Sequence, residues 1–286
     1  MCRLFIYQGP KTGMHDLLVR PGHSLLKQSF ESQERSYSVN ADGFGVAWYQ
    51  EEISPEPAVF REITPAWSNR NLIEISRLIQ SKRIFAHVRA ASHGIPVDET
   101  NCHPFKYKHM LWMHNGKIAC FRKIRRAISN RLSEEAYNLI QGNTDSEYAF
   151  ALFLDHLWET KSDCYGPADY IRAFNATLEI ICGLNQECEE HNSLNFAFTD
   201  GKITLISRFS DSGEKDPPSL YYSAGKKMGY DKNKLKIVQS SEDENFLIIA
   251  SEPLNNQPAV WEEIPENALM IINENLNYHF LQIEIC

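Results

Sequence analysis

Residues 195–207 read NFAFTDGKITLIS, and they predict an antiparallel β-hairpin. The dipeptide Asp200-Gly201 is a tight-turn signal, and the runs on either side of it, residues 195–199 and 202–207, have the composition of strands. The C-terminal third of the chain is therefore predicted to be mainly β structure. Further strand-like runs follow at residues 219–223, 246–250, 268–272 and 278–285, whereas residues 210–218 and 226–236 read as polar loops.

The rest of the chain alternates between strand-like and helical patterns. Strand-like runs occur at residues 3–7, 44–49, 84–88 and 110–113, and residues 92–105 read as a loop. Helical spacing occurs at residues 72–79, capped by Ser68 or Asn69, and at residues 133–140, 144–158 and 169–182. Thr144 and Glu147 have the spacing of a capping box before the third of these helices. Strands from both ends of the chain with helices between them indicate two sheets covered by helices.

The composition excludes several classes of protein. The chain has 286 residues, 29 Lys and Arg against 37 Asp and Glu, and a formal net charge of −8, which argues against binding nucleic acid or a membrane surface through bulk charge. Its longest apolar run covers residues 148–154, whereas a membrane span needs roughly 20 residues. The length suits about two domains of roughly 150 residues or one large domain. We expect a soluble protein.

The seven cysteines do not form a recognisable framework. An odd number cannot all pair, and neither a Cys-x-x-Cys motif nor a zinc-type Cys/His spacing occurs, so no metal site is expected. The N-terminus also lacks the basic and apolar stretches of a signal peptide. We therefore expect a cytoplasmic location, where free thiols are the usual state.

Cys2 differs from the other cysteines by its position. Removal of Met1 would make it the N-terminal residue, and its α-amine, with a reference pKa near 7.7–8.0, would then serve as a base beside the thiol. The alternative is that Cys2 is simply a small residue at the start of a buried strand. Position alone does not decide between the two.

Three further polar clusters follow predicted strands or open a helix. Arg89 ends a strand and would pair with the carboxylate of a ligand or with an internal acidic residue. Asn115 and Gly116 could hold an oxyanion through the side-chain amide and the next N–H, although Asn-Gly is also a common turn dipeptide. Asp145 could receive an ammonium group or could simply cap its helix.

Taken in order, these residues resemble the site of the class II glutamine amidotransferases, which are N-terminal-nucleophile hydrolases. Within that family the chain is similar to the stand-alone branch of glutathione-degrading and γ-glutamyl hydrolase subunits, because HVRAAS, ETNCHPF and HNGKI are followed by Phe121 and a basic patch. The stretches that carry the resemblance span almost the whole chain: MCRLFIY, ADGFGVAWY, FAHVRAASHG, ETNCHPF, LWMHNGKI, NTDSEYAFALFL, NFAFTDGKITLISR and IIASEPL.

The resemblance implies a role for each of these residues. Cys2 would attack the γ-carbonyl carbon of a γ-glutamyl substrate and form a thioester, and Asn115 and Gly116 would stabilise the oxyanion. Arg89 would bind the α-carboxylate of the substrate, and Asp145 its α-ammonium. No metal or organic cofactor is implied.

The resemblance adds weaker expectations for four other residues. Ser92 and His93 match positions that line the substrate pocket in some relatives. Asn101 and His103 match a loop that supports the site.

The resemblance also implies the fold and the domain organisation. The expected fold is α+β, a four-layer αββα sandwich of two packed antiparallel sheets flanked by helices. A single domain would cover residues 2–286, with a mainly helical layer at about residues 120–190 and C-terminal strands at residues 256–286. The matching pattern ends near residue 255, and the rest is too short for a synthase domain.

The leading hypothesis is hydrolysis of glutamine or of a γ-glutamyl peptide, with a small-molecule γ-glutamyl compound as the partner. Two alternatives stay open: a glutaminase subunit that feeds a separate synthase, and a non-catalytic sensor of γ-glutamyl metabolites. A papain-like enzyme is disfavoured because the Cys-His-Asn order and context are missing. A separate partner subunit is also left open.

Overall fold

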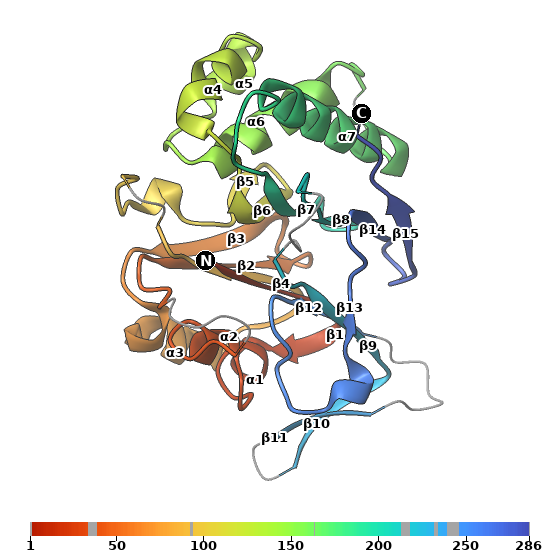
Figure 1. Ribbon diagram of the computed structural model, residues 1–286. Helices are drawn as coiled ribbons and strands as arrows, with labels where there is room; N and C mark the ends of the chain where they lie inside the picture. Colours follow the sequence, from red (N-terminus) through yellow and green to blue (C-terminus); the bar gives the residue numbers. More distant parts are fainter. Residues whose placement is uncertain are drawn as a thin grey trace.

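The computed structural model describes residues 2–33, 39–91, 94–162, 164–212, 218–231, 234–238 and 246–285 (Figure 1). Two large antiparallel sheets lie between two sets of helices, as the αββα sandwich requires. The predicted α+β class and the four-layer arrangement are thereby confirmed.

The first sheet has seven strands in the order β13-β9-β12-β1-β4-β2-β3. Strand β1 lies at its centre, between β12 and β4, so the N-terminal segment is held on both sides. Its strands are β1 (Arg3–Gly13), β2 (Phe44–Gln50), β3 (Ser54–Glu62), β4 (Gln80–Val88), β9 (Tyr221–Gly225), β12 (Phe246–Ala250) and β13 (Glu262–Glu263).

The second sheet has six strands in the order β15-β14-β8-β7-β6-β5. The predicted hairpin is present as β7 and β8, joined across Asp200-Gly201, with Gly201 at φ +90°. Its strands are β5 (Phe105–Tyr107), β6 (Met110–Lys117), β7 (Ser193–Thr199), β8 (Thr204–Arg208), β14 (Ala268–Ile272) and β15 (Tyr278–Gln282).

The helices form the two outer layers (Figure 1). Helices α1 (Met14–Leu18), α2 (Leu25–Gln28) and α3 (Arg70–Ser76) cover the seven-stranded sheet. Helices α4 (Phe121–Ser129), α5 (Glu134–Asn138), α6 (Asp145–Trp158) and α7 (Pro167–Leu184) cover the six-stranded sheet. Short 3-10 helices lie at Ala66–Ser68, Glu99–Asn101 and Pro258–Val260.

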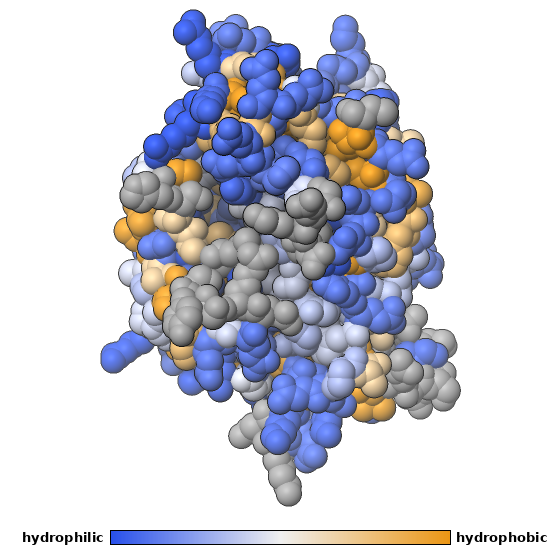
Figure 2. Space-filling model, in the orientation of Figure 1, coloured by the Kyte–Doolittle hydropathy of each residue, from blue (hydrophilic) through white to orange (hydrophobic). Residues whose placement is uncertain are grey.

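The outer surface is mostly hydrophilic on the face shown in Figure 2, with hydrophobic residues scattered among the polar ones. Within the described part of the chain, no helix is both long enough and apolar enough to cross a membrane.

The alternation of side chains along the strands explains the layers. In β1, Leu4 and Ile6 face the other sheet, whereas Phe5 and Tyr7 face α1 and α2. In β6, Leu111 and Met113 likewise join the core between the sheets. Both faces of β1 and β6 are therefore buried over most of their length, and these two strands read as nearly continuous apolar runs in the sequence.

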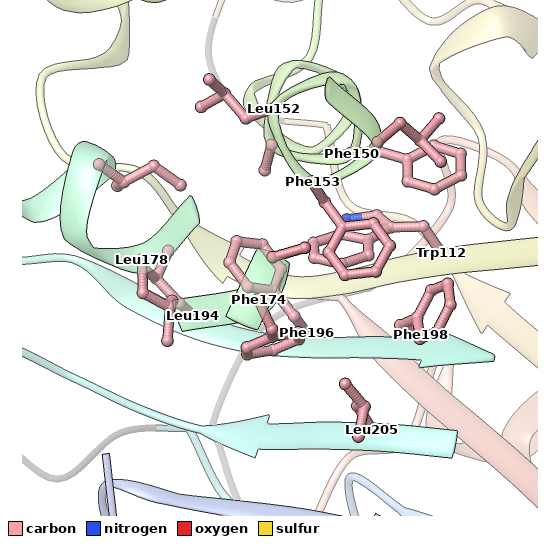
Figure 3. Close-up of a cluster of buried hydrophobic side chains, with 14 of the residues drawn as sticks. Trp112, Phe150, Leu152, Phe153, Phe174, Leu178, Leu194, Phe196, Phe198 and Leu205 are labelled. Carbon is pink, nitrogen blue, oxygen red and sulfur yellow. The ribbon is translucent and has the colours of Figure 1, made fainter. Parts of the chain in front are cut away.

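An aromatic cluster joins the six-stranded sheet to α6 and α7 (Figure 3). Trp112 of β6 lies at its centre, with its ring centroid 4.7 Å from that of Phe196 and 5.3 Å from that of Phe153. Phe153 in turn packs 4.5 Å from Phe198. This packing fixes α6, and therefore its first residue Asp145, relative to the end of β6.

Two sequence predictions were wrong. Residues 226–236 were predicted as a loop, but Lys227–Asp231 (β10) and Lys234–Val238 (β11) form a hairpin in which Leu235 and Ile237 are buried. The lysines that alternate with these two residues hide the apolar period. All cysteines were expected to be free thiols, but Cys120 and Cys188 form a disulfide. They are 68 positions apart, so spacing could not reveal the pair.

Candidate active site

The predicted site residues come from the ends of three strands and the start of one helix. Cys2 precedes β1, Arg89 follows β4, Asn115 and Gly116 lie near the end of β6, and Asp145 is the first residue of α6. Strands β1 and β4 pair with Arg3 opposite Val88, which places Cys2 beside the segment that follows β4.

The Cys2 thiol contacts the backbone of Ala90. Its Sγ lies 3.6 Å from the carbonyl oxygen of Ala90 and accepts a hydrogen bond from the Ala90 N–H at 3.4 Å. Burial raises the pKa of the Cys2 thiol; the Ala90 N–H and the Arg89 charge lower this pKa by less, and the Asp145 charge raises it further. The thiol is therefore protonated at neutral pH and needs a base before it can attack a carbonyl.

Arg89 is buried and forms no ion pair with a carboxylate among the described residues. Among the described residues, its guanidinium donates to the carbonyl oxygens of Asp42, at 3.4 Å, and Pro96, at 3.3 Å. The Asp42-Gly43 turn fixes the backbone beside it, because the Arg89 N–H donates to the Gly43 carbonyl oxygen at 2.8 Å. The sequence left two partners open for Arg89, an internal acidic residue and the carboxylate of a ligand. The described structure contains no internal carboxylate that pairs with it.

Asn115 and Gly116 are not in a turn. They lie in β6 opposite Asn195 and Leu194 of β7, so the turn alternative is wrong. The Asn115 Nδ2 donates to the Ser251 Oγ at 3.1 Å, which fixes the amide and leaves its second N–H for another acceptor.

A side chain at Gly116 would not fit. An added Cβ would overlap with the carbonyl oxygen of Ser193 and lie 2.7 Å from its carbonyl carbon. The glycine therefore permits the close approach of two backbones at this end of β6.

Asp145 links the start of α6 to the segment that follows Gly116. Its Oδ2 accepts the Ile118 N–H at 2.8 Å, and its Oδ1 accepts the Ser146 N–H at 2.9 Å. The predicted N-cap is Thr144, whose Oγ1 accepts the Glu147 N–H at 3.3 Å. The Glu147 carboxylate bonds to residues 141 and 142 instead of the N-cap backbone, so only half of the predicted capping box forms.

Three buried histidines lie behind the site. The ring of His87 lies 4.2 Å from that of His103, and His87 Nε2 lies 3.2 Å from the carbonyl oxygen of His114. Burial lowers the pKa of His87 to about 3, lowers that of His103 well below its usual value, and also lowers that of His114. All three rings are neutral at pH 7 and pack as core residues.

The other predicted positions differ in outcome. Asn101 is buried and bridges two loops, because its Nδ2 donates to the Pro96 carbonyl oxygen at 3.1 Å and its Oδ1 accepts the Asn143 N–H at 3.0 Å. Ser92 and His93 lie outside the described residues.

Sequence reasoning missed the residues that hold Cys2 from behind. Ser251 follows β12; its Oγ accepts the Leu4 N–H at 3.0 Å as well as the Asn115 amide. Arg3 donates from Nη1 to the Cys2 carbonyl oxygen at 3.0 Å and from Nε to the Glu252 carboxylate at 2.7 Å. The only signal in the sequence was IIASEPL, which contains Ser251 and Glu252 but does not say what they contact.

Glu252 is the centre of this buried network. Burial raises the pKa of its carboxyl group, but hydrogen bonds from His23, Ser32 and the Gln33 N–H and the charge of Arg3 outweigh that effect and hold the pKa at about 2. The carboxylate therefore stays ionised, and β1 is tied to the end of β12 directly behind Cys2.

The arrangement combines a thiol with groups that could hold an oxyanion and two opposite charges. A thiol, an amide N–H donor, a buried guanidinium and a carboxylate come from four different elements at one end of the sandwich. Among the described residues, no group of three or more His, Cys, Asp or Glu side chains is arranged to hold a metal ion.

The chain is similar to known proteins over most of its length. The family model described as glutamine amidotransferases class-II matches residues 19–277. The chain is 37% identical over 294 aligned residues to the probable glutamine amidotransferase DUG3 of Saccharomyces cerevisiae, covering 96% of this chain and 82% of that one. It is also 29% identical to the gamma-glutamyl-hercynylcysteine sulfoxide hydrolase of Mycobacterium tuberculosis, over 41% of this chain and 50% of that one.

A solved structure shares the fold. The glutamine aminotransferase class-II domain protein from Silicibacter pomeroyi superposes with a TM-score of 0.69 at 24% identity, and the match covers 100% of both chains. Because the family model and the yeast relative both match most of the sequence, the chain belongs to the class II glutamine amidotransferases.

Proposed function

We propose that this protein hydrolyses the γ-glutamyl amide bond of glutamine or of a γ-glutamyl peptide, with Cys2 as the nucleophile after removal of Met1. The observation that carries the proposal is Arg89, which directly precedes the Ala90 backbone that the Cys2 thiol contacts: its guanidinium is buried and has no carboxylate partner among the described residues. A buried cation of this kind is stable only when an anion or several acceptors satisfy it, and a substrate α-carboxylate fits its planar fork.

The reaction begins with proton transfer from the thiol. The α-amine of Cys2, directly or through a water, accepts the proton, and Sγ attacks the γ-carbonyl carbon. The raised pKa of the thiol supports a mechanism in which the base acts during attack rather than one that starts from a stable thiolate.

The tetrahedral intermediate carries a negative charge on the former carbonyl oxygen. The free N–H of the Asn115 amide and the backbone N–H of Gly116 would donate to this oxygen, and Ser251 keeps the amide in place. The α-ammonium then protonates the leaving nitrogen as its bond to carbon breaks, which leaves a thioester. Water attacks the thioester, glutamate departs, and the thiol regains its proton.

Substrate binding would use two opposite charges. Arg89 binds the α-carboxylate and Asp145 the α-ammonium of the glutamyl group, and both charges act on the Cys2 thiol. Asp145 already accepts two backbone N–H groups, so it is held in one orientation before substrate arrives. Ser92 and His93 remain predicted pocket residues, and we propose that residues 2–286 act as one domain.

The decisive experiment measures glutamate release from glutamine and from γ-glutamyl peptides by wild type and by Cys2→Ala. Wild type should release glutamate, and Cys2→Ala should be inactive. Intact mass should show that Met1 is absent, since a retained Met1 would block the α-amine. Release of glutamate by Cys2→Ala would refute the nucleophile.

Asp145→Asn tests the ammonium contact separately. The variant keeps an oxygen that can accept the Ile118 N–H, so the loop after Gly116 should hold its position. It should raise KM for the amino acid by about tenfold or more and change kcat less, because one charge-assisted contact is lost. An unchanged KM would show that Asp145 does not bind the ammonium group.

Two alternatives predict different results. A glutaminase subunit would release glutamate at an appreciable rate only when its synthase is added. A sensor would bind γ-glutamyl compounds without turnover even though Met1 is absent. We favour the hydrolase, because the curated relatives are named as an amidotransferase and as a hydrolase.

A further inference from the structure

The backbone that follows Gly116 depends on contacts from distant parts of the chain. It begins at Lys117, the last residue of β6, and leads to the start of α4. Cys120, the residue before α4, adopts φ +49°, a conformation that a non-glycine residue rarely takes, and its side chain forms the disulfide with Cys188 instead of capping the helix. Residues 117–120, here called the connecting segment, are therefore held mainly by tertiary contacts.

Each residue of the connecting segment contacts a residue far away in the sequence. Three of the contacts reach one short stretch, residues 188–192, and the fourth reaches the start of α6. They are the ion pair of Lys117 with Glu190 at 2.7 Å, the bond from the Ile118 N–H to Asp145 Oδ2 at 2.8 Å, the bond from the Ala119 N–H to Asn192 Oδ1 at 2.9 Å and the disulfide of Cys120 with Cys188. The stretch 188–192 thus supports the backbone between Gly116 and α4.

The contact with Asn192 is the most deeply buried of the four. Lys117 and Glu190 have exposed side chains, so their ion pair adds little. The side chain of Asn192 and the residue that it contacts, Ala119, are both fully buried. Water cannot replace either partner there, so this hydrogen bond holds the backbone of Ala119 in one place.

The amide of Asn192 is fixed in one orientation. Its Oδ1 also accepts a hydrogen bond from Asn185 Nδ2 at 2.9 Å, and its Nδ2 donates to the Asp211 carboxylate and to the Cys182 Sγ at 3.9 Å. An amide group has two acceptor and two donor positions, and all four are used here. A rotated amide would place its NH2 group against the Ala119 N–H and lose these bonds.

The backbone of Asn192 is held as well as its side chain. Its N–H donates to Asp211 Oδ1 at 2.7 Å, and its carbonyl oxygen accepts the Ser210 hydroxyl at 3.0 Å. The next residue, Ser193, forms a β-bridge with Ser210, and its carbonyl oxygen lies against Gly116. Asn192 therefore links the segment that follows β8 to the end of β6.

We propose that Asn192 is a positioning residue for the proposed reaction. It holds the Ala119 N–H and thereby fixes the backbone between Gly116, whose N–H would donate to the oxyanion, and Ile118, whose N–H orients Asp145. The inference rests on the proposed function and deepens it, because it assigns the alignment of both groups to a residue that acts through Ala119 and not on the substrate itself.

A shift of the connecting segment should act mainly on kcat. The Gly116 N–H would donate to a charge that exists only in the transition state, whereas Arg89 and Asp145 would bind the ground state as well. Asp145 also keeps its bond to the Ser146 N–H when the connecting segment moves. Loss of the Asn192 contact should therefore lower kcat more than it raises KM.

The experiment uses glutamine as the substrate and measures kcat and KM from glutamate release, with urea denaturation as the measure of folding. Asn192→Ala removes the acceptor of the Ala119 N–H. Ser210→Ala is the matched control, because it removes a buried hydrogen bond to the carbonyl oxygen of Asn192 and leaves the contact with Ala119 in place. Both variants should have a lower free energy of unfolding, but only Asn192→Ala should lower kcat, by about tenfold or more.

An exchange of the two partners tests the hydrogen bond itself. Asn192→Asp places two carboxylates against each other and should lower both kcat and the free energy of unfolding. In the double variant Asn192→Asp/Asp211→Asn, position 192 keeps an oxygen for the Ala119 N–H, and the new amide at position 211 can donate to the carboxylate at position 192. The double variant should regain kcat to within about threefold of wild type, and it keeps the contact even where Asn192→Ala does not fold.

A folded Asn192→Ala protein with kcat within about threefold of wild type would overturn the inference and leave the proposed function intact. An equal loss of kcat in Ser210→Ala would also overturn it, because the loss would then follow from lower stability and not from the contact with Ala119. A folded double variant that does not regain kcat would overturn it as well. No glutamate from wild type would refute the proposed function, and the inference with it.

Discussion

Gly116→Ala is the sharpest test of the proposed oxyanion site. An added Cβ would overlap with the carbonyl oxygen of Ser193 and lie 2.7 Å from its carbon, where carbon atoms normally approach to roughly 3.5–4.0 Å. Strand β6 or β7 must therefore move by about 1 Å at this point. Ser193 cannot yield freely, because its carbonyl oxygen lies 3.1 Å from His114 Nε2.

The expected loss of kcat follows from the narrow range of distances at which an oxyanion site can use its hydrogen-bond donors. Donors act at roughly 2.7–3.1 Å, so a shift of about 1 Å is equivalent to losing one donor, and kcat should fall by about 10²–10³. The overlap should also lower the free energy of unfolding by about 1–3 kcal/mol, as overpacking does elsewhere. KM should change less, because Arg89 and Asp145 do not depend on the Gly116 N–H.

Steady-state glutamate release gives kcat and KM, and urea denaturation gives the free energy of unfolding. Gly183→Ala is the control, because an added Cβ at Gly183 in α7 meets no atom within 4 Å. That variant should keep wild-type kcat and gain about 0.5–1 kcal/mol of stability. A folded Gly116→Ala protein with kcat within threefold of wild type would refute the assignment of Gly116 to the oxyanion site.

Three other perturbations have defined outcomes. Ser251→Ala removes the acceptor of the Asn115 amide and should lower kcat by about tenfold with little change in KM, since a hydrogen bond is worth about 1 kcal/mol; a KM effect alone would contradict this. Cys188→Ser removes the disulfide to Cys120, which closes a long loop, and should lower the free energy of unfolding by up to about 4 kcal/mol. Reductant should lower the denaturation midpoint of wild type for the same reason, and an unchanged midpoint would contradict this prediction. Burial holds the pKa of His87 at about 3, so as the pH falls the unfolded chain binds a proton at this residue before the folded protein does. The contribution of His87 to the free energy of unfolding should therefore be constant above about pH 6.5 and fall by about 1.4 kcal/mol per pH unit below it. Denaturation at pH 7 and pH 5 checks this, because His87→Gln should lose less free energy of unfolding between the two pH values than wild type does.

Much of the fold could be predicted because its signals are local. The Asp200-Gly201 turn, the Asn69 cap of α3 and the Thr144 cap of α6 each depend on residues a few positions apart, and each is present. The β10–β11 hairpin was missed because its buried Leu235 and Ile237 alternate with lysines, so the apolar signal was weak.

The candidate site could be predicted only as a set of separate residues. Whether Arg89 pairs internally, and whether Asn115 lies in a turn, depends on elements far away in the sequence. Local spacing holds no information on such contacts, so both alternatives stayed open until the strands were placed.

The sequence alone determined the family resemblance, the order of the elements and the identity of the nucleophile candidate, because those depend on residue types and short spacings. The tertiary structure decided what surrounds Cys2: the network of Arg3 and Glu252 behind it, and Ser251 beside Asn115. These contacts join residues up to 249 positions apart, and only the packing of two sheets against their helices brings them together.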